Sequence, residues 1–357
     1  MTERIQKLRK ALSGEGLDAL LVSEPLHIRY LSGFSGDSGL ALVGPQQTFL
    51  ITDFRYEEQA RIQAPGAQLL IAKDGFVEKM AELSPEVTGH RIGFEEAHLP
   101  YKTYKKLREH LSHAEWIAQD GLVERLSIVK DAQEIAHIRE AVRIADRVFE
   151  QIVPLLRPGI AEREIAAEME YAIRKHTPEG PSFEAIVASG PRSSMPHASV
   201  TDRKIRSGDL VILDFGAISG GYASDVTRTL AIGTPTAEQR KIHEIVLHAQ
   251  EAALAAAKAD MSCSELDRVA RTIVEHAGYG PQFGHSLGHG VGLNVHEQPR
   301  ISSKSEHILK PGMVVTIEPG IYLPGWGGVR IENLVVIHQN GCENLTTAPK
   351  QLELRNA

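Results

Sequence analysis

Two aspartates, Asp214 and Asp225, lie on either side of a short turn within one strongly apolar stretch of the sequence. Asp214 follows Leu-Val-Ile-Leu, so we expect its side chain to be buried, and a two-residue turn at Ser219 and Gly220 places Asp225 directly opposite it. Opposed side chains on one sheet face have Cβ atoms roughly 4.5–5.5 Å apart, where like charges are destabilising. A buried pair of this kind needs a shared proton or a bound cation, whereas an exposed hairpin edge would leave both acids solvated.

A second acidic pair, Glu318 and Glu332, occupies the corresponding place in a repeat of the same pattern. Residues 206–216 align without gaps on residues 310–320, which matches Asp214 with Glu318, and a turn near Gly325 places Glu332 opposite Glu318. A pseudo-twofold arrangement of the two halves would bring all four carboxylates together, and such crowding raises carboxyl pKa values. A shared proton can serve one pair, but two divalent metal ions account better for both pairs.

Four histidines and one arginine accompany the acids. His285, His289 and His296 lie in a glycine-rich segment, and His197 lies in Met-Pro-His-Ala. A lone histidine is more often a satisfied polar residue than a ligand, but glycines let the backbone approach a site closely. We therefore expect these histidines near the acids. Arg330, in the same run as the last acid, is expected to be the buried counter-ion of the acidic cluster.

The elements that must position these residues follow from the apolar periodicity. An apolar stripe at three- and four-residue steps predicts a long helix after residue 134. The order helix, helix, hairpin then occurs twice, so residues 126–357 are predicted to be one α/β (α+β) domain with a pseudo-twofold repeat. The expected helices cover about 135–152, 161–175, 236–258 and 264–277, and the expected strands cover 209–215, 223–232, 313–318 and 329–337.

Residues 1–125 are expected to form a separate mixed α/β domain, because a chain of 357 residues exceeds the size at which one core keeps growing. We predict no catalytic residue in this domain. An amphipathic helix over 3–13 is followed by short apolar runs broken by glycine and proline: Ala19–Val22, Leu40–Val43, Phe49–Thr52 and Gln68–Ile71.

Composition restricts the compartment and the partners. A net charge of −7 argues against binding to nucleic acid or to a membrane surface, which would need a basic face. The charged N-terminal residues lack the apolar region of a signal peptide, and no apolar run approaches the ~20 residues that span a bilayer. Cys263 and Cys342 fit packed thiols in a reducing compartment. The expected location is the cytoplasm.

Taken together, the motifs resemble those of metallopeptidase family M24, whose members have the pita-bread fold. The resemblance covers about residues 130–350 and rests on Asp214, Asp225, Gly-His289-Gly, Ile-Glu318-Pro-Gly and Arg330-Ile-Glu332-Asn. The N-terminal region resembles the creatinase/prolidase N-terminal domain, which methionine aminopeptidases lack. Tyr30-Leu-Ser-Gly-Phe-Ser-Gly and His296-Glu-Gln-Pro point to the proline-specific branch rather than to creatinase.

The resemblance implies two divalent metal ions per subunit. Carboxylate oxygens with one imidazole and no thiolate suit Mn²⁺, and Co²⁺ or Zn²⁺ can also occupy such a site. The ions would activate a water that attacks the carbonyl carbon before proline, with Glu318 accepting and passing on the proton. His296 and His197 would stabilise the tetrahedral intermediate, and His285 would line the leaving-group side. The implied ligands are Asp214, Asp225, His289, Glu318 and Glu332.

The resemblance also implies a proline-containing peptide as the substrate and a homodimer as the assembly. Three classes stay open: a proline-specific exopeptidase, a creatinase-type C–N hydrolase that needs no metal, and an inactive binding module. The intact ligand set argues against the last two. Arg300, four residues after His296, resembles an arginine of microbial prolidases and could bind the free carboxylate of a dipeptide, although a solvated loop arginine is the alternative. We therefore favour an Xaa-Pro dipeptidase (prolidase), with an Xaa-Pro aminopeptidase as the alternative.

Overall fold

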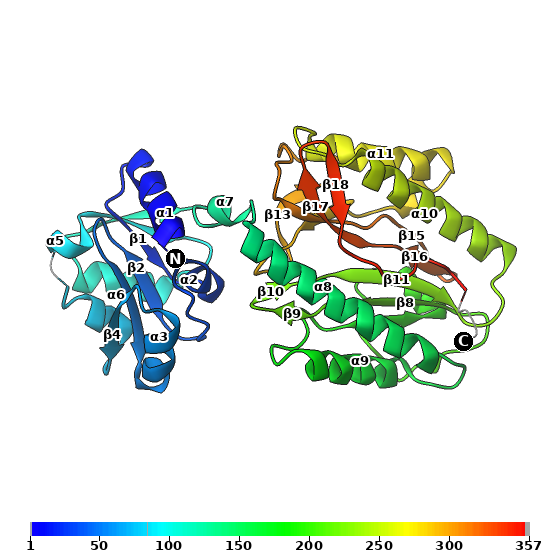
Figure 1. Ribbon diagram of the computed structural model, residues 1–357, viewed down its shortest axis with the longest axis horizontal. Helices are drawn as coiled ribbons and strands as arrows, with labels where there is room; N and C mark the ends of the chain where they lie inside the picture. The colour runs from blue at the N-terminus through cyan, green and yellow to red at the C-terminus, as the bar shows by residue number, and fades with distance from the viewer. Residues whose placement is uncertain (1, 84, 354–357) are drawn as a thin grey trace. The chain divides into compact units, whose positions relative to one another are not determined.

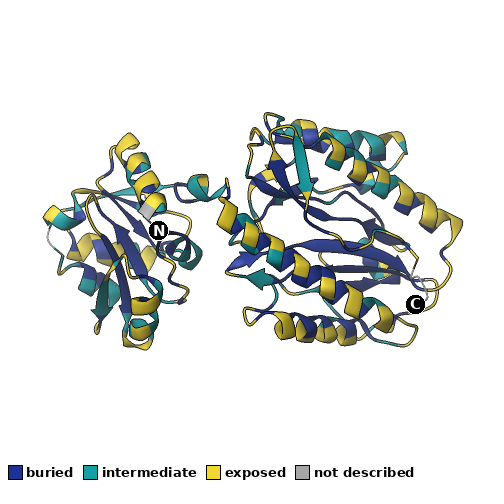
Figure 2. Ribbon diagram, viewed as in Figure 1, coloured by how far each residue is buried: buried dark blue, intermediate teal, exposed yellow. Residues whose placement is uncertain are grey.

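The computed structural model describes residues 2–83 and 85–353, and the chain divides into two compact units, Met1–Ser127 and Ile128–Ala357 (Figure 1). The predicted boundary between residues 125 and 126 lies close to this division. In both units the strands are mostly buried and the helices expose one face (Figure 2). No helix within the described ranges is long and apolar enough to cross a membrane.

The N-terminal unit is built on one six-stranded sheet with the order β4-β3-β2-β1-β5-β6. β2 pairs antiparallel with both of its neighbours, whereas the β3–β4, β1–β5 and β5–β6 pairs are parallel, so the expected mixed α/β domain is confirmed. The strands are β1 (Ala19–Val22), β2 (Leu40–Val43), β3 (Thr48–Asp53), β4 (Gln68–Ala72), β5 (Arg91–Glu95) and β6 (Glu115–Gln119). The helices are α1 (Thr2–Gly14), α2 (Pro25–Ser32), α3 (Glu57–Gln63), α4 (Phe76–Met80), α5 (Pro85–Thr88), α6 (Tyr101–His110) and α7 (Glu124–Ser127).

The C-terminal unit repeats the order helix, helix, strands, as the sequence predicts. Its first half contains α8 (Ala132–Ile152), α9 (Glu162–His176), β7 (Ile186–Ser189), β8 (Leu210–Phe215), β9 (Ile218–Ser219), β10 (Tyr222–Ala223) and β11 (Val226–Ala231). Its second half contains α10 (Ala237–Ala256), α11 (Cys263–His276), β12 (Gly288–Gly290), β13 (Glu297–Ile301), β14 (Val314–Ile317), β15 (Gly320–Leu323), β16 (Gly327–Arg330), β17 (Asn333–His338) and β18 (Gly341–Asn344).

The strands of the C-terminal unit lie between its helices, with α9 on one side and α10 and α11 on the other (Figure 1). The main sheets have the orders β11-β8-β7 and β13-β12-β14-β17-β18. Three of the four long helices begin with a capping box formed by side chains of the sequence: Asp131 with Glu134, Thr236 with Gln239, and Ser262 with Glu265. These caps fix where the helices start and so help to hold the sheets between them.

The register of the first hairpin differs from the prediction. β8 pairs with β11 so that Asp214 lies opposite Thr227, and Asp225 is two residues before that position. The turn is formed by Gly220 and Gly221, which both have positive φ, at 59° and 87°. A two-residue hairpin turn of this kind needs positive φ at both central positions, which two glycines meet and Ser219 does not. Because side chains alternate with a period of two, the shift keeps Asp225 on the same face as Asp214.

The register of the second hairpin is confirmed. Ile317 pairs with Asn333 and Gly320 pairs with Arg330, so Glu318 and Glu332 lie between two ladders that share one register. Both acids stand where the strands are interrupted, since β14 ends before Glu318 and β16 ends before Glu332. Glu318 and Glu332 therefore lie between strands rather than within one.

Candidate metal centre

Carboxylates from both halves of the C-terminal unit meet at one place. Oxygens of Asp214, Asp225 and Glu332 all lie within 4.8 Å of one another. Glu332 also forms such a group with Glu318 and His289, whose ligand atoms meet the same limit. The five residues that the resemblance implies as ligands are therefore brought together, although they come from positions 214 to 332 of the chain.

Three oxygens in this cluster are buried and lack a hydrogen-bond partner within residues 2–83 and 85–353: Asp214 Oδ1, Asp225 Oδ1 and Glu332 Oε1. Their residues are only 8, 5 and 2% exposed. An unpaired buried carboxylate oxygen is costly, because burial removes water without replacing its hydrogen bonds. The donor set thus fits divalent cations, which would supply the missing partners.

Protein donors hold other oxygens of the same acids. Arg330 Nη2 donates to Asp214 Oδ2 at 2.5 Å, and Thr227 Oγ1 donates to Glu332 Oε2 at 2.6 Å. Thr316 Oγ1 donates to Glu318 Oε1 at 3.0 Å. The predicted place of Arg330 beside the acids is observed, whereas the two threonines were missed. A signal existed for Thr316, because a residue two positions before Glu318 in a strand shares its face.

Burial and mutual repulsion make the acids reluctant to ionise. Burial, followed by the charges of Glu332, Asp214 and Glu318, raises the pKa of Asp225 well above its ordinary value. Burial and the charges of Glu318 and Asp214 do the same for the pKa of Glu332, and burial raises the pKa of Glu318. Without cations, this site would take up protons at pH values where free carboxylates are ionised.

His289 presents one ring nitrogen to the acids. Its Nδ1 lies 3.0 Å from the carbonyl oxygen of Gly290, and its Nε2 lies 3.3 Å from Glu318 Oε1 and 3.6 Å from Asp225 Oδ2. Donation from Nδ1–H to the carbonyl leaves the lone pair of Nε2 free for a metal ion. The glycine before His289 is required, because a Cβ at Gly288 would lie 2.0 Å from the carbonyl oxygen of Thr316.

His296 borders the acidic cluster, because one of its ring nitrogens lies within 4.8 Å of ligand atoms of Asp225 and His289. The rings of His296 and His289 are 4.3 Å apart between centroids, and His296 and His197 are exposed. Burial, followed by the charge of His289, lowers the pKa of His296, and His197 adds to this effect. A neutral imidazole of His296 can accept or donate a hydrogen bond to a ligand beside the acids.

A tyrosine that the sequence analysis missed connects His285 to the acids. Arg330 Nη1 donates to the hydroxyl of Tyr322 at 2.8 Å, and that hydroxyl lies 3.0 Å from His285 Nε2. Burial raises the pKa of Tyr322 to about 12, so the hydroxyl keeps its proton and donates it to His285. His285 Nδ1 lies 2.7 Å from the carbonyl oxygen of Ser286, which fixes the proton on Nδ1. Tyr322 lies in β15, where it pairs with Gly328 of β16, and Arg330 is the last residue of β16.

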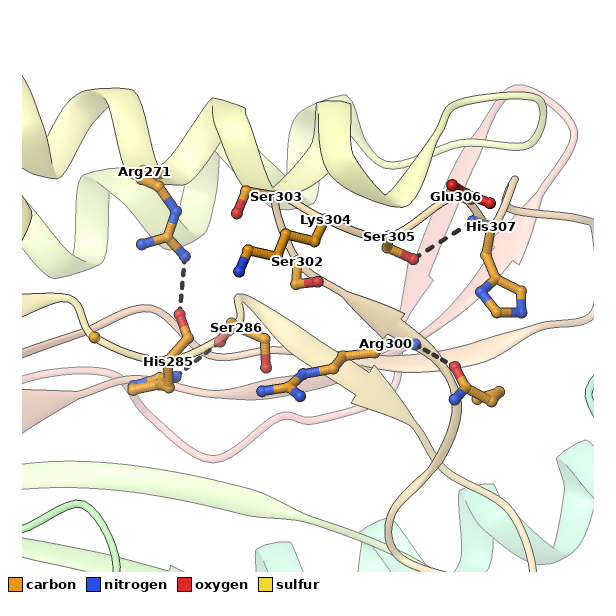
Figure 3. Close-up of a pocket in the computed structure, with 12 residues that line it drawn as sticks. Arg271, His285, Ser286, Arg300, Ser302, Ser303, Lys304, Ser305, Glu306 and His307 are labelled. Atoms are coloured by element: carbon orange, nitrogen blue, oxygen red, sulfur yellow. Dashed lines mark hydrogen bonds between the residues drawn. The ribbon is translucent and has the colours of Figure 1, made fainter.

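His285 also lines an open pocket of about 730 Å³ (Figure 3). Arg300 and Lys304 extend into this pocket on the side where His285 and Ser286 lie (Figure 3). Neither cationic head group has a hydrogen bond or ion pair among the described residues. Arg271, by contrast, is paired with Asp267 at 2.7 Å. The pocket thus offers two unpaired positive charges next to the network that leads to the metal centre.

Comparison with known proteins identifies the family. Residues 136–339 match the model of metallopeptidase family M24, and residues 4–129 match the creatinase/prolidase N-terminal domain. The chain belongs to metallopeptidase family M24. The family and the pita-bread fold expected from the sequence are thereby confirmed, as is the class of enzyme.

Several relatives of this M24 chain are named for their substrates. An Xaa-Pro dipeptidase of Pyrococcus furiosus is 39% identical and covers 99% of this chain and 100% of its own. A solved Xaa-Pro dipeptidase from Bacillus anthracis is 41% identical, with a TM-score of 0.96 and 99% of both chains covered. A solved X-Pro aminopeptidase from Thermotoga maritima is 39% identical, with a TM-score of 0.90, covering 95% of this chain and 98% of its own.

Proposed function

We propose that this protein is a dinuclear metal-dependent exopeptidase that hydrolyses the bond before proline, and that its substrates are Xaa-Pro dipeptides. The observation that carries the proposal is the convergence of Asp214, Asp225, Glu318, Glu332 and His289, with three buried oxygens left unpaired. The names of the relatives from Pyrococcus furiosus and Bacillus anthracis support the choice of substrate.

The five converging residues would hold two divalent ions per subunit. Four carboxylates and one imidazole, with no thiolate, favour Mn²⁺, while Co²⁺ and Zn²⁺ are also compatible with this donor set. When bound, such ions supply Lewis-acid activation of a water molecule and of the scissile carbonyl. We also propose that the protein is cytoplasmic and that it forms a homodimer. Sedimentation of the purified chain at several concentrations would test the homodimer.

Glu318 is the proposed proton carrier. Its raised pKa, caused first by burial, suits a carboxylate that takes a proton from the attacking water and returns it to the leaving amine. The hydroxyl of Thr316 holds Oε1 in place, so the carboxylate does not rotate freely. Like the leaving nitrogen of any peptide bond, the proline nitrogen must gain a proton to leave as an amine, and Glu318 would deliver the proton taken from the water.

His197 and His296 are proposed to contact the substrate carbonyl side, because both are exposed, the ring of His296 lies beside His289, and the charge of His197 acts on His296. His285 is proposed to face the proline side. Its Nε2 accepts from Tyr322, so Arg330, Tyr322 and His285 form one line of hydrogen bonds that starts at Asp214. This line would position His285 when the metal site is occupied.

Arg300 supports the choice of a dipeptide over a longer peptide. A dipeptide ends in a carboxylate on proline, whereas a longer substrate continues past it. A guanidinium can bind that carboxylate through charge-assisted hydrogen bonds worth about 1.5–3 kcal/mol. The unpaired Arg300 head group in the pocket beside His285 supports the proposal of this role.

The test compares Ala-Pro with Ala-Pro-Ala on the wild type and on Arg300→Ala, in the presence of Mn²⁺. We expect the variant to raise KM for the dipeptide by roughly tenfold or more and to leave the tripeptide almost unchanged. Arg268→Ala, an exposed arginine of α11 outside the pocket, is the matched control. A wild type that strongly prefers the tripeptide would instead support an Xaa-Pro aminopeptidase, as the Thermotoga maritima relative is named.

A further inference from the structure

A second group of potential metal ligands lies in the N-terminal unit, away from the acids described above. His27 is in the first turn of α2, His98 lies in the turn after β5, and Glu124 begins α7. One ligand atom from each residue lies within 4.8 Å of the other two. Glu124 Oε1 is 4.0 Å from His27 Nε2 and 3.9 Å from His98 Nε2.

Both histidines direct Nε2 towards Glu124 because a carboxylate holds the other ring nitrogen. Nδ1 of His27 lies 2.5 Å from Glu95 Oε1, and Nδ1 of His98 lies 2.9 Å from Glu24 Oε2. A carboxylate on the far nitrogen is the usual support of a metal-binding histidine, since it fixes the tautomer and the ring orientation. Two histidines supported in this way face the same carboxylate.

Glu95 is itself firmly oriented. Its Oε2 accepts from the backbone N–H groups of Ser23 and Glu24, at 2.6 and 2.9 Å. Burial raises the pKa of Glu95, but its hydrogen bonds to His27 and to the backbone outweigh this and lower the pKa below its ordinary value. The support of His27 is therefore a preformed, ionised carboxylate with its side chain 7% exposed.

The charges of the cluster favour a cation. Within residues 2–83 and 85–353, the ion pairs of Glu24, Glu95 and Glu124 all involve these two histidines. Three carboxylates thus surround two imidazoles that are neutral unless protonated. Against the lowering effect of burial, the hydrogen bond to Glu95 and the charges of the three carboxylates raise the pKa of His27, so a proton on this ring offsets part of the charge. A divalent ion would take the place of that proton and balance more of the charge.

We propose that His27, His98 and Glu124 form a zinc-binding site, with a fourth position open to water. Two imidazole nitrogens and one carboxylate oxygen are a common zinc donor set. Ligand atoms around a tetrahedral zinc with bonds of about 2.0–2.1 Å lie about 3.3 Å apart. The observed 3.9 and 4.0 Å therefore require shifts of a few tenths of an ångström per ligand. In the metal centre of the C-terminal unit, His289 Nε2 lies 3.3 and 3.6 Å from its carboxylates.

The position of the ligands suggests what the ion does. Glu124 lies just before Ser127, the last residue of the N-terminal unit, whereas His27 and His98 belong to the body of that unit. A zinc ion would tie the outgoing chain to α2 and to the end of β5. The ion would cross-link these segments of the unit, and the site contains none of the residues proposed for peptide hydrolysis.

The experiment measures zinc bound to the full-length chain when the other metal centre is disabled. The background variant is Asp225→Asn with Glu332→Gln, which removes two of the acids there. Metal-free protein is dialysed against micromolar Zn²⁺, and bound zinc per chain is measured by mass spectrometry. We expect the background variant to keep one zinc per chain. Adding His98→Asn should weaken zinc binding at least tenfold, while adding His110→Asn, an exposed histidine of α6, should leave it unchanged.

His98 is suited to this test because its side chain is 33% exposed, so its replacement should not unfold the unit. Glu124→Gln, which keeps the shape of the side chain, is the second variant and should also lose zinc. On an otherwise wild-type chain, His98→Asn should leave peptide hydrolysis unchanged, which separates this proposal from the proposed function. A background variant that binds no zinc, or one that keeps its zinc after both His98→Asn and Glu124→Gln, would overturn the proposal.

Discussion

Replacing Asp225 by asparagine is expected to have opposite effects on the stability of the metal-free and the metal-loaded protein. Asp225 is 5% exposed and lies among other carboxylates whose oxygens are within 4.8 Å. In the metal-free chain the substitution removes one of these charges. The new amide also offers N–H donors to the unpaired oxygens of Asp214 and Glu332. In the loaded protein it removes an anionic ligand instead.

The size of the effect follows from Coulomb's law. Two unit charges at 4.8 Å interact by about 3.5 kcal/mol at an effective dielectric constant of about 20. Arg330 and partial protonation of the cluster offset part of this repulsion, so we expect Asp225→Asn to stabilise the metal-free protein by about 1–3 kcal/mol at pH 8. For a domain of this size, that corresponds to a rise in melting temperature of roughly 2–10 °C.

The effect should depend on pH in a defined direction. Burial, followed by its acidic neighbours, raises the folded-state pKa of Asp225 above its ordinary value of 3.8. Between these two pKa values the folded state binds more protons than the unfolded state, so the contribution of Asp225 to stability falls as pH rises. This stabilising contribution is fully present at pH values below the ordinary pKa of Asp225, and it is lost as the pH rises through the raised pKa of the folded state. The advantage of Asp225→Asn should therefore be small near pH 4 and grow towards pH 8.

The assay follows the fluorescence of Trp326 during heating, with Trp116→Phe in every chain so that only the C-terminal unit reports. Samples contain either a chelator or excess Mn²⁺. Asp202→Asn, an exposed aspartate paired only at the surface with Arg163, is the control. Two results would refute the reasoning: a chelated Asp225→Asn chain that melts below the wild type at pH 8, or a difference that does not change with pH.

Three further outcomes follow from the same site and its surroundings. Asp225→Asn should lower the rate of Ala-Pro hydrolysis by more than about a hundredfold, and mass spectrometry should show that the variant binds less metal. Full activity of the variant after chelation would exclude the two-metal mechanism. Tyr322→Phe should lower kcat for Ala-Pro by about 10–100-fold without removing the metals, because Arg330 Nη1 and His285 Nε2 lose the hydroxyl that both contact. An unchanged kcat would contradict the role of this network of hydrogen bonds. Arg228→Met should destabilise the C-terminal unit by about 1–3 kcal/mol in urea titrations, because Arg228 is 1% exposed and its loss leaves the carbonyls of Ala348 and Glu332 without this donor. A loss below about 0.5 kcal/mol would show that these bonds are dispensable.

Much of the metal site could be predicted because Asp214 lies in a strand and Asp225, Glu318 and Glu332 lie directly beside strand ends. Side chains in a strand alternate strictly, so even the wrong turn at Ser219 and Gly220 left Asp214 and Asp225 on one face. The internal repeat then supplied the second pair, and the symmetry of the Gly325 turn gave its register. The correct first turn was also available in principle, because two consecutive glycines meet the requirement for positive φ better than a serine and a glycine.

Contacts between distant segments could not be predicted in the same way. Tyr322 contributes only its hydroxyl to the site, and nothing in Gly-Ile-Tyr-Leu distinguishes that hydroxyl from one that faces solvent. The ligands of the N-terminal cluster lie at positions 27, 98 and 124, with no common spacing and no repeat. Their convergence depends on the pairing of β1 with β5, which brings α2 and the end of β5 to the same edge.

The two clusters share one physical principle. At the metal centre, one oxygen of Asp214 is held by Arg330 and one oxygen of Glu332 is held by Thr227, while the other oxygen of each acid is buried without a partner. In the N-terminal unit, one nitrogen of each histidine is held by a carboxylate while the other faces Glu124. A side chain with two polar atoms can be oriented through one of them and present the other to an ion. Orientation by other protein groups lowers the entropy lost when an ion binds, so side chains that are held through one polar atom suit a metal site better than mobile acids at the surface.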